Sequence, residues 1–217
     1  MTAQTLDADL PLDYVYRPPA GDSGDDTLVA VLHGRGADET DLLPVADELP
    51  ASHVLSLRAP DRLMGGYTWY ELDIPDGDLH RSEPDADGFR RSLDLAADAV
   101  DAAADTLDVD TVGLLGFSQG SITSTALLVE APDRYDWVVG LHGYLAASHA
   151  DRDTDLRGTP VFLGAGRADQ IIPAFRVEEA ADRLRAMSAD VTFERYDAGH
   201  GVAPDELADV VAFVDAR

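Results

Sequence analysis

Apolar and polar residues alternate along this chain in two distinct patterns. The first is a short run of apolar residues bounded by Gly, Pro or Asp, which predicts a buried β-strand. We expect such strands at Thr27–Leu32, Val54–Leu57, Thr111–Phe117, Trp137–Leu141, Pro160–Ala165 and Val191–Tyr196. The segment Leu12–Arg17 predicts a further strand at an antiparallel edge.

In the second pattern apolar residues recur at steps of three and four, which is the spacing of one face of an α-helix. In Phe89–Leu107 this spacing is clear, and aspartates occupy the opposite face. Three more helices are expected, and two of them have Pro in the first turn, where proline is favoured. They are Ser121–Glu130, Pro173–Met187 and Pro204–Val214.

The order of these elements predicts the fold class. Strands alternate with helices, and the strands are too apolar to have a face in water, so we expect an α/β protein with a mostly parallel central sheet and helices on both faces. The length fits a single domain over residues 1–217. The polar stretch from Ile74 to Gly88 is too short for a large cap domain and predicts at most a small flap.

Charge and composition exclude several classes of protein. The chain has 42 acidic and 16 basic residues, a formal net charge of −26, and no cysteine. Such a surface repels nucleic acid and anionic membranes, and without cysteine there are no disulfides, thiolate zinc sites or Cys nucleophiles. Every basic residue is Arg, and 33 of the acids are Asp. We interpret this bias as adaptation to concentrated salt, where the Debye length is roughly 3 Å at 1 M.

The chain shows no signal for export or membrane insertion. Its first residues lack the basic flank and apolar run of a signal peptide. No stretch approaches the roughly 18 uninterrupted apolar residues that a membrane-spanning helix requires. These patterns predict a cytoplasmic protein.

One motif carries nucleophilic chemistry. The expected strand Thr111–Phe117 runs directly into Gly116-Phe117-Ser118-Gln119-Gly120, and a helix follows. A serine on such a tight turn from strand to helix exposes its hydroxyl above the sheet, next to the unpaired N–H groups of the helix. The alternative is a structural glycine turn with an incidental serine. We predict that Ser118 is a nucleophile.

A serine hydroxyl needs a general base, and the base needs a carboxylate to orient it. In this architecture the chain order is Ser, acid, His. His200 follows the last expected strand and is the predicted base, and Asp169 follows the preceding strand and is the predicted acid. Asp197, three residues before His200, is a rival acid that the sequence leaves open.

A tetrahedral intermediate also needs N–H donors for its oxyanion. The N–H of Gln119, just after the nucleophile, is one candidate, and the N–H of Arg35 in His33-Gly34-Arg35-Gly36 is the second. His33 is expected to pack and brace this loop rather than to act as a base.

Residues after other strands reach the same edge of the sheet and predict a substrate pocket. Met64, Tyr67 and Trp69 are expected to line an acyl or aryl site, although ordinary packing under a surface loop is the alternative for the aromatic residues. His142 is expected at the rim, and Ile171 beside Asp169.

Together these motifs resemble the α/β-hydrolase fold and, within it, the phospholipase/carboxylesterase family that includes the acyl-protein thioesterases. The resemblance covers nearly the whole chain and rests on Leu32–Gly36, Gly116–Gly120, Gly164–Pro173 and Ala198–His200 followed by Pro204–Leu207. It implies Ser118, Asp169 and His200 as the catalytic triad and the amides of Arg35 and Gln119 as the oxyanion donors. It also implies hydrolysis of carboxylic esters or thioesters without cofactor or metal.

The sequence thus predicts a serine hydrolase that acts on small to medium acyl groups through an acyl-serine, as a monomer or homodimer. An acyltransferase or lactonase with the same triad, and a non-catalytic binding module, are the alternatives. In acyl-protein thioesterases a small apolar residue commonly stands at the position of Arg35. This departure suggests that the Arg35 side chain binds an anionic group of the substrate.

Overall fold

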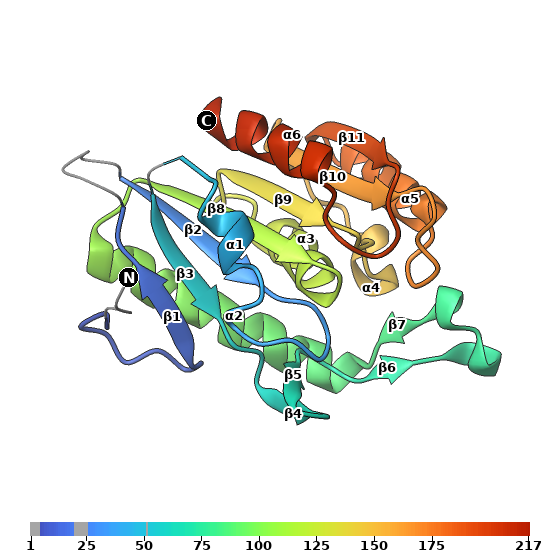
Figure 1. The fold of residues 1–217 in the computed structure, drawn as a ribbon, viewed down its shortest axis with the longest axis horizontal. Coiled ribbons are helices and arrows are strands. Elements are labelled where there is room, and N and C mark those ends of the chain that lie inside the picture. Colours follow the sequence, from blue (N-terminus) through green and yellow to red (C-terminus); the bar gives the residue numbers. More distant parts are fainter. Residues whose placement is uncertain (1–4, 20–25, 51) are drawn as a thin grey trace.

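The computed structural model describes residues 5–19, 26–50 and 52–217. In these residues a seven-stranded sheet has the order β1-β3-β2-β8-β9-β10-β11 (Figure 1). Only β1 is antiparallel, to β3, so the predicted mostly parallel sheet with an antiparallel edge strand is confirmed. The strands are β1 (Tyr14–Arg17), β2 (Thr27–Leu32), β3 (His53–Leu57), β8 (Thr111–Phe117), β9 (Trp137–Leu141), β10 (Pro160–Gly166) and β11 (Asp190–Tyr196).

Helices cover both faces of the sheet. The long helices α2 (Ala86–Leu107), α3 (Gln119–Glu130) and α5 (Ala174–Ala186) contribute to one apolar core, and α6 (Pro204–Asp215) contributes to a second core on the opposite face. All four were expected. The short helices α1 (Leu43–Ala46) and α4 (Ala147–Ala150) were not, because a single turn has too few residues to show a helical period.

The two cores explain why the strands read as continuous apolar runs. In β2, Leu28, Ala30 and Leu32 belong to the core under α2, α3 and α5, while Val29 and Val31 belong to the core under α6. Successive side chains of a strand point to opposite faces. Since helices cover both faces, every one of these residues is buried.

Helix α2 begins earlier than its apolar period predicts. Its N-cap is Asp85, whose carboxylate accepts a hydrogen bond from the N–H of Gly88 at 2.8 Å. An aspartate at this position satisfies one of the N–H groups that a helix start leaves unpaired. The last residues of the polar stretch therefore belong to the first turn of α2.

The polar stretch from Ile74 to Gly88 was expected to form at most a small flap. Most of it belongs to an arm, which we define as residues 72–84. It consists of the two-stranded ribbon β6 (Leu72–Asp73) and β7 (Glu83–Pro84) with two 3₁₀ turns between them. The described residues form no large cap domain. The carbonyl oxygen of Ser82 accepts hydrogen bonds from the Tyr144 hydroxyl at 2.7 Å and from Arg176 Nη1 at 2.8 Å. These contacts hold the arm against the loop after β9 and against α5.

Candidate active site

Ser118 lies in the tight turn between β8 and α3. Its backbone has φ 53° and ψ −116°, in the sparsely populated left-handed half of the conformational map, which costs about 1–3 kcal/mol. A Cβ at Gly116 would lie 2.3 Å from the carbonyl oxygen of Gly120, and a Cβ at Gly120 would lie 1.9 Å from that of Leu32. Glycine at both positions therefore allows this close approach of strand, turn and helix.

The structure brings Ser118, His200 and Asp169 together. His200 Nε2 lies 3.1 Å from Ser118 Oγ, and the Nδ1–H of His200 donates to Asp169 Oδ2 at 2.8 Å. The rival acid Asp197 is exposed, whereas the Asp169 side chain is buried beside the imidazole. With Nδ1 holding the proton, Nε2 is the acceptor that faces the serine hydroxyl.

The carboxylate of Asp169 accepts four hydrogen bonds. Oδ2 accepts from His200 and from His142 Nδ1 at 2.9 Å, and Oδ1 accepts from the N–H groups of Ile171 and Ile172 at 2.9 and 3.0 Å. Burial by itself would raise the pKa of Asp169, but these hydrogen bonds together outweigh burial and lower it. Asp169 is therefore held as an anion.

Gln119 is the first residue of α3, so its main-chain N–H has no acceptor within the helix. Its side chain makes three hydrogen bonds elsewhere. Oε1 accepts from the Thr68 hydroxyl at 2.9 Å and from the N–H of Trp69 at 3.2 Å, and Nε2–H donates to the carbonyl of Tyr70 at 2.9 Å. The side chain thus fastens the end of the β4–β5 hairpin (Asp61–Leu63 and Gly66–Thr68) and the two residues after it to the turn that carries Ser118.

The loop that carries Arg35 is braced from below by His33. His33 Nε2 accepts from the N–H of Ala59 at 3.1 Å, so Nδ1 carries the proton and donates to the carbonyl of Gly34 at 2.7 Å. Burial lowers the pKa of His33 and favours this neutral form. His33 therefore packs beneath the loop, while the guanidinium of Arg35 forms an ion pair with Glu71 at 3.3 Å.

Of the residues predicted to line the substrate pocket, Trp69 does not do so, and Met64 remains a prediction. Trp69 is fully buried, and its Nε1–H donates to the carbonyl of His33 at 2.9 Å, so it supports the loop from behind. Met64 occupies the tip of the β4–β5 hairpin and is 94% exposed. Met64 and Gly65 have φ of 44° and 95°, as a two-residue hairpin turn requires.

Tyr67 and Ile171, the other predicted pocket residues next to the sheet edge, differ from each other. The ring of Tyr67 lies under the guanidinium groups of Arg58 and Arg62, at 4.8 and 5.5 Å from its centroid. Ile171 is 45% exposed, and its N–H is bound to Asp169. Of the two, Ile171 has an exposed side chain directly beside the carboxylate.

The expectation that His142 lies at the rim of the site is wrong. Its side chain has no exposed surface, and its ring lies between two carboxylates, Asp169 and Glu206, with Nε2 3.2 Å from Glu206 Oε2. Burial, the largest influence, lowers the pKa of His142, but the hydrogen bonds and charges of the two carboxylates raise it to about 9.

Glu206 was not singled out by sequence reasoning. It stands in the first turn of α6, where an acidic residue reads as part of a capping box, and its carboxylate does accept from the N–H of Ala203 at 3.2 Å. The same oxygen, Glu206 Oε2, also faces His142. This contact depends on how α6 packs against the sheet, so the sequence alone could not show it.

The nearest ligand atoms of His142, Asp169 and His200 lie within 4.8 Å of one another. Both imidazoles approach a single oxygen, Asp169 Oδ2, at 2.9 and 2.8 Å. These contacts are hydrogen bonds from two N–H groups to one carboxylate oxygen, and they account for the grouping without a metal ion.

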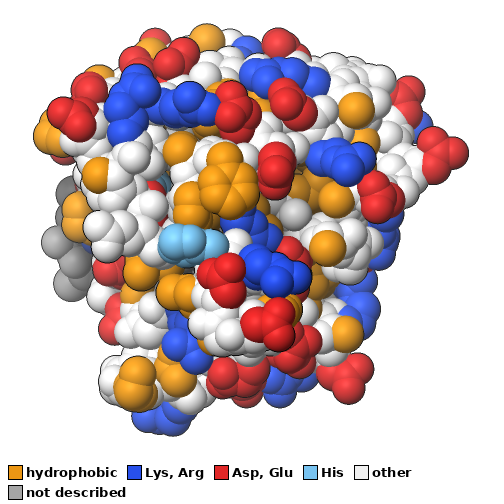
Figure 2. Space-filling model, turned by 90° about the vertical axis from the view of Figure 1, so that its right-hand side faces the viewer, with side chains coloured by type: hydrophobic (Ala, Val, Ile, Leu, Met, Phe, Trp, Pro, Cys, Tyr) orange, Lys and Arg blue, Asp and Glu red, His pale blue; other side chains and the backbone are white. Residues whose placement is uncertain are grey.

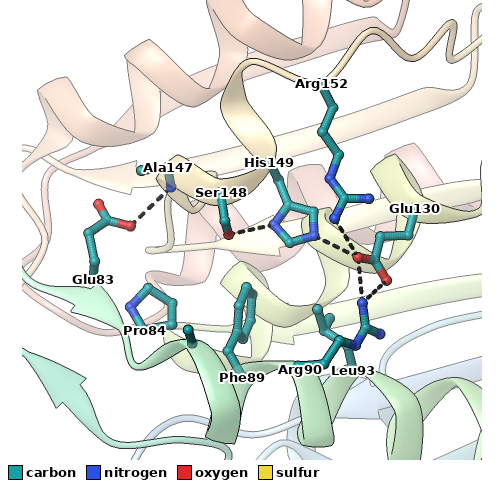
Figure 3. Close-up of a pocket in the computed structure, with 11 residues that line it drawn as sticks. Glu83, Pro84, Phe89, Arg90, Leu93, Glu130, Ala147, Ser148, His149 and Arg152 are labelled. Atoms are coloured by element: carbon teal, nitrogen blue, oxygen red, sulfur yellow. Dashed lines mark hydrogen bonds and ion pairs between the residues drawn. The ribbon is translucent and has the colours of Figure 1, made fainter.

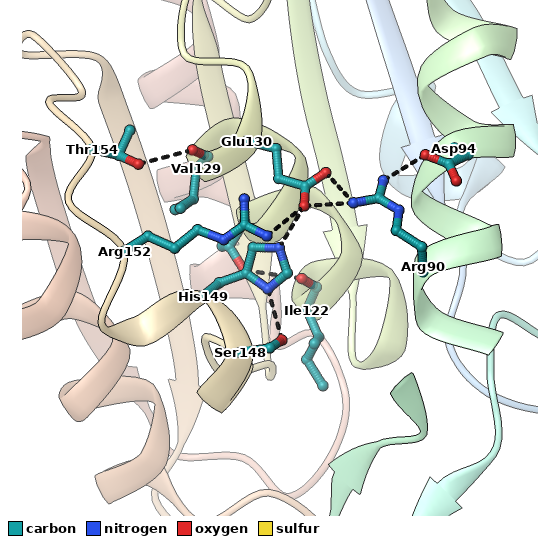
Figure 4. Close-up of polar contacts among 10 residues, drawn as sticks. Arg90, Asp94, Ile122, Val129, Glu130, Ser148, His149, Arg152 and Thr154 are labelled. Carbon is teal, nitrogen blue, oxygen red and sulfur yellow. Dashed lines mark hydrogen bonds and ion pairs between the residues drawn. The ribbon is translucent and has the colours of Figure 1, made fainter. Parts of the chain in front are cut away.

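A cavity of about 350 Å³ lies elsewhere, between α2, α3 and α4 (Figure 3). On its wall the carboxylate of Glu130 accepts hydrogen bonds from Arg90 at 2.6 Å, His149 at 3.1 Å and Arg152 at 2.9 Å (Figure 4). The charged groups of the cluster are paired with one another, so the cluster fastens the end of α3 to its neighbours. It thereby supports the helix that follows Ser118.

The parallel sheet, the serine turn and the order of the three converging residues define an α/β-hydrolase. Residues 20–217 match the phospholipase/carboxylesterase family, so the chain belongs to that family and is a hydrolase. No helix of the described residues is long and apolar enough to span a membrane.

Similar proteins are consistent with membership of this family. Acyl-protein thioesterase 1 of Gibberella zeae is 29% identical over 208 residues, which are 89% of this chain and 85% of the relative. The putative hydrolase MhqD of Bacillus subtilis is 28% identical, with 83% of this chain and 88% of the relative covered. The solved structure of a carboxylesterase from Mesorhizobium loti has a TM-score of 0.84 at 22% identity, and covers 98% of this chain and 99% of its own.

Proposed function

We propose that this protein is a serine esterase that cleaves carboxylic esters or thioesters of small to medium acyl groups through an acyl-Ser118 intermediate. The observation that carries the proposal is the continuous hydrogen-bonded chain from Ser118 Oγ through His200 to Asp169, at 3.1 and 2.8 Å. Both distances lie within the reach that nucleophile activation requires.

In the proposed reaction His200 Nε2 takes the proton of Ser118 as Oγ attacks the acyl carbonyl carbon. Asp169 stabilises the imidazolium that forms, and the N–H groups of Gln119 and Arg35 stabilise the oxyanion. His200 then returns the proton to the departing alcohol or thiol, which leaves an acyl-serine. A water molecule, deprotonated by His200, attacks this ester, and the acid and the free serine are released.

An apolar surface beside the triad suits the acyl group. Ile171 and Phe175 are 45% and 53% exposed and lie near the start of α5, and Leu79 of the arm is 37% exposed. His80 Nε2 lies 2.9 Å from the carbonyl oxygen of Gln170, which places the arm next to Ile171. Figure 2 shows apolar side chains at the centre of this face with charged ones around them. We infer that the acyl chain binds here.

The choice between ester and thioester rests on the relatives. The Gibberella zeae relative is named an acyl-protein thioesterase, and the Mesorhizobium loti structure is that of a carboxylesterase. Both reactions pass through a tetrahedral oxyanion and lead to the same acyl-serine, so the triad serves either.

Labelling with a fluorophosphonate probe tests the proposed function. The probe should modify the wild-type protein at Ser118, whereas a non-catalytic binding module would remain unlabelled. A panel of p-nitrophenyl esters and acyl thioesters of graded chain length, assayed at 2 M salt, then defines the substrate. Product analysis with a competing alcohol separates hydrolysis from acyl transfer, and ring-opening of lactones tests the lactonase alternative.

Arg35 allows a separation of its N–H from its side chain. Arg35→Pro removes the N–H and should lower kcat for ester hydrolysis by about 10²–10³-fold, the usual effect of losing one oxyanion donor. Arg35→Leu keeps the N–H and should leave kcat/KM nearly unchanged, because the guanidinium is already paired with Glu71. Steady-state kinetics at 2 M salt, with circular dichroism to verify folding, provide the measurement.

Two results would count against these assignments. Equal activity of the Pro and Leu variants would show that the Arg35 N–H is not a donor. A selective loss of activity on anionic esters in Arg35→Leu would show instead that the side chain binds an anionic group.

A further inference from the structure

His142 and Glu206 form a buried pair behind Asp169 that the reaction proposed above does not use. His142 follows β9, Asp169 follows β10, and Glu206 lies in α6, so three separate elements bring them together. The His142 ring contacts Asp169 Oδ2 at 2.9 Å and Glu206 Oε2 at 3.2 Å. Neither the His142 nor the Glu206 side chain has exposed surface.

These contacts require a proton beyond those of neutral histidine and two carboxylates. A neutral imidazole has one N–H and one lone pair, whereas both nitrogens of His142 face carboxylate oxygens. With one nitrogen bare, a lone pair would face a carboxylate lone pair in a buried site. A second N–H on the ring removes this repulsion, and His142 and Glu206 together then carry no net charge.

The surroundings of the ring support a cationic form. Within the described residues, Asp169, Glu206 and His200 are the ionisable groups that contact it, and the His200 ring packs edge-on with its centroid 5.6 Å away. The Phe117 ring packs at 5.5 Å and supplies an apolar wall. Two of the three ionisable neighbours are acids, and they raise the pKa of His142 to about 9.

The backbone around the pair is shaped to hold it. His142 has φ 52°, in the left-handed region, which is uncommon for residues other than glycine and often marks functional positions. A Cβ at Gly164 of β10 would lie 2.0 Å from Glu206 Oε1, so glycine there leaves room for the carboxylate. That oxygen is buried and has no hydrogen-bond partner, so the polar contacts of this carboxylate with His142 and Ala203 are made through Oε2.

We propose that His142, protonated on both ring nitrogens and paired with Glu206, is a positioning residue that orients Asp169 and offsets part of its negative charge at His200. The proposal rests on the proposed roles of Ser118, Asp169 and His200. A cation this close to His200 opposes protonation of the His200 imidazole. His142 and Glu206 thereby extend activity toward lower pH.

Glu206→Gln tests the pair with little change of shape. The amide can donate to His142 Nε2, so the ring becomes neutral and still donates from Nδ1 to Asp169. With the positive charge gone, protonation of the base is favoured, and the acid limb of the pH profile of kcat/KM should move up by about half to one pH unit. The value of kcat on the plateau of the pH profile should change less than kcat/KM on the acid limb. The assays use p-nitrophenyl acetate at 2 M salt.

Asp205→Asn is the matched control. It removes one carboxylate from the same turn of α6, but Asp205 is exposed and salt screens its charge. Its acid limb should coincide with that of the wild type. Equal profiles for Glu206→Gln and Asp205→Asn, in folded proteins, would overturn the proposal.

Nitrogen-15 NMR of histidine-labelled protein gives a readout that does not depend on activity. The His142 ring should show two protonated nitrogens at pH 7, assigned by their loss in His142→Asn, a substitution that tolerates positive φ. A single protonated nitrogen, or titration near the ordinary value of 6.5, would contradict the proposal. Full activity of Ser118→Ala would instead reject the proposed function and leave this NMR result standing.

Discussion

Replacing Ser118 by Ala should lower kcat/KM for ester hydrolysis by at least about 10⁴-fold, because the reaction loses its nucleophile and the base loses its proton donor. The hydroxyl is the group that His200 Nε2 faces at 3.1 Å. Alanine keeps the Cβ atom of serine, so the strain of the positive φ at position 118 should stay about the same, and we expect the variant to fold. Hydrolysis of p-nitrophenyl esters and fluorophosphonate labelling, both at 2 M salt, measure the effect.

Ser124→Ala is the matched control for this substitution. It makes the same chemical change on the same helix, and the Ser124 hydroxyl is buried without a hydrogen-bond partner. Its activity should therefore stay close to that of the wild type. Triad variants keep far less than about 1% of the wild-type activity. If Ser118→Ala kept more than that, the nucleophile would have to lie elsewhere.

The second large effect concerns salt. The far-UV circular dichroism of the protein should be lost below about 0.1 M salt and retained at 2 M, because the Debye length falls from about 10 Å to about 3 Å between 0.1 and 1 M. Helix α2 shows the cause locally, since its outer face presents four aspartates at steps of three and four: Asp94, Asp98, Asp101 and Asp105. Burial and the charges of Asp105 and Asp98 raise the pKa of Asp101 against the opposing effect of Arg134.

Asparagine variants on this face separate charge repulsion from other effects of salt. Asp94 and Asp101 are paired with Arg90 and Arg134, whereas no ion pair is found for Asp98 and Asp105 in the part of the chain that the structure describes. Asp98→Asn with Asp105→Asn should lower the salt concentration needed for folding, and Asp101→Asn should lower it less because an ion pair is lost. Equal stability of the wild type at 0.1 and 2 M salt would refute salt adaptation.

Local patterns were enough to predict most of the secondary structure and the three converging residues. Strand Thr111–Phe117 was predicted with its observed bounds because a fully buried strand must be apolar throughout. The turn at Ser118 was recognisable because close contact there leaves room only for glycine at 116 and 120. Chain order then placed His200 and Asp169 after the last two strands.

The surroundings of these residues could not be predicted in the same way. His142 was expected at the rim because it follows a strand, but its partner Glu206 lies 64 residues further along the chain. Trp69 was expected to contact substrate, yet it is buried against the loop that carries His33. Whether a polar or aromatic side chain is exposed depends on the elements that pack over it, and these are remote in sequence.

The sequence by itself determined the order of strands and helices, the glycine turn around Ser118 and the excess of aspartate, because each depends on spacing or composition along the chain. Only the tertiary structure decided that Asp169 rather than Asp197 faces His200, and that Asp169 is shared with a buried histidine. Those choices depend on which side chains meet when α6 packs on the sheet, since hydrogen bonds and burial act over a few ångströms regardless of distance along the chain.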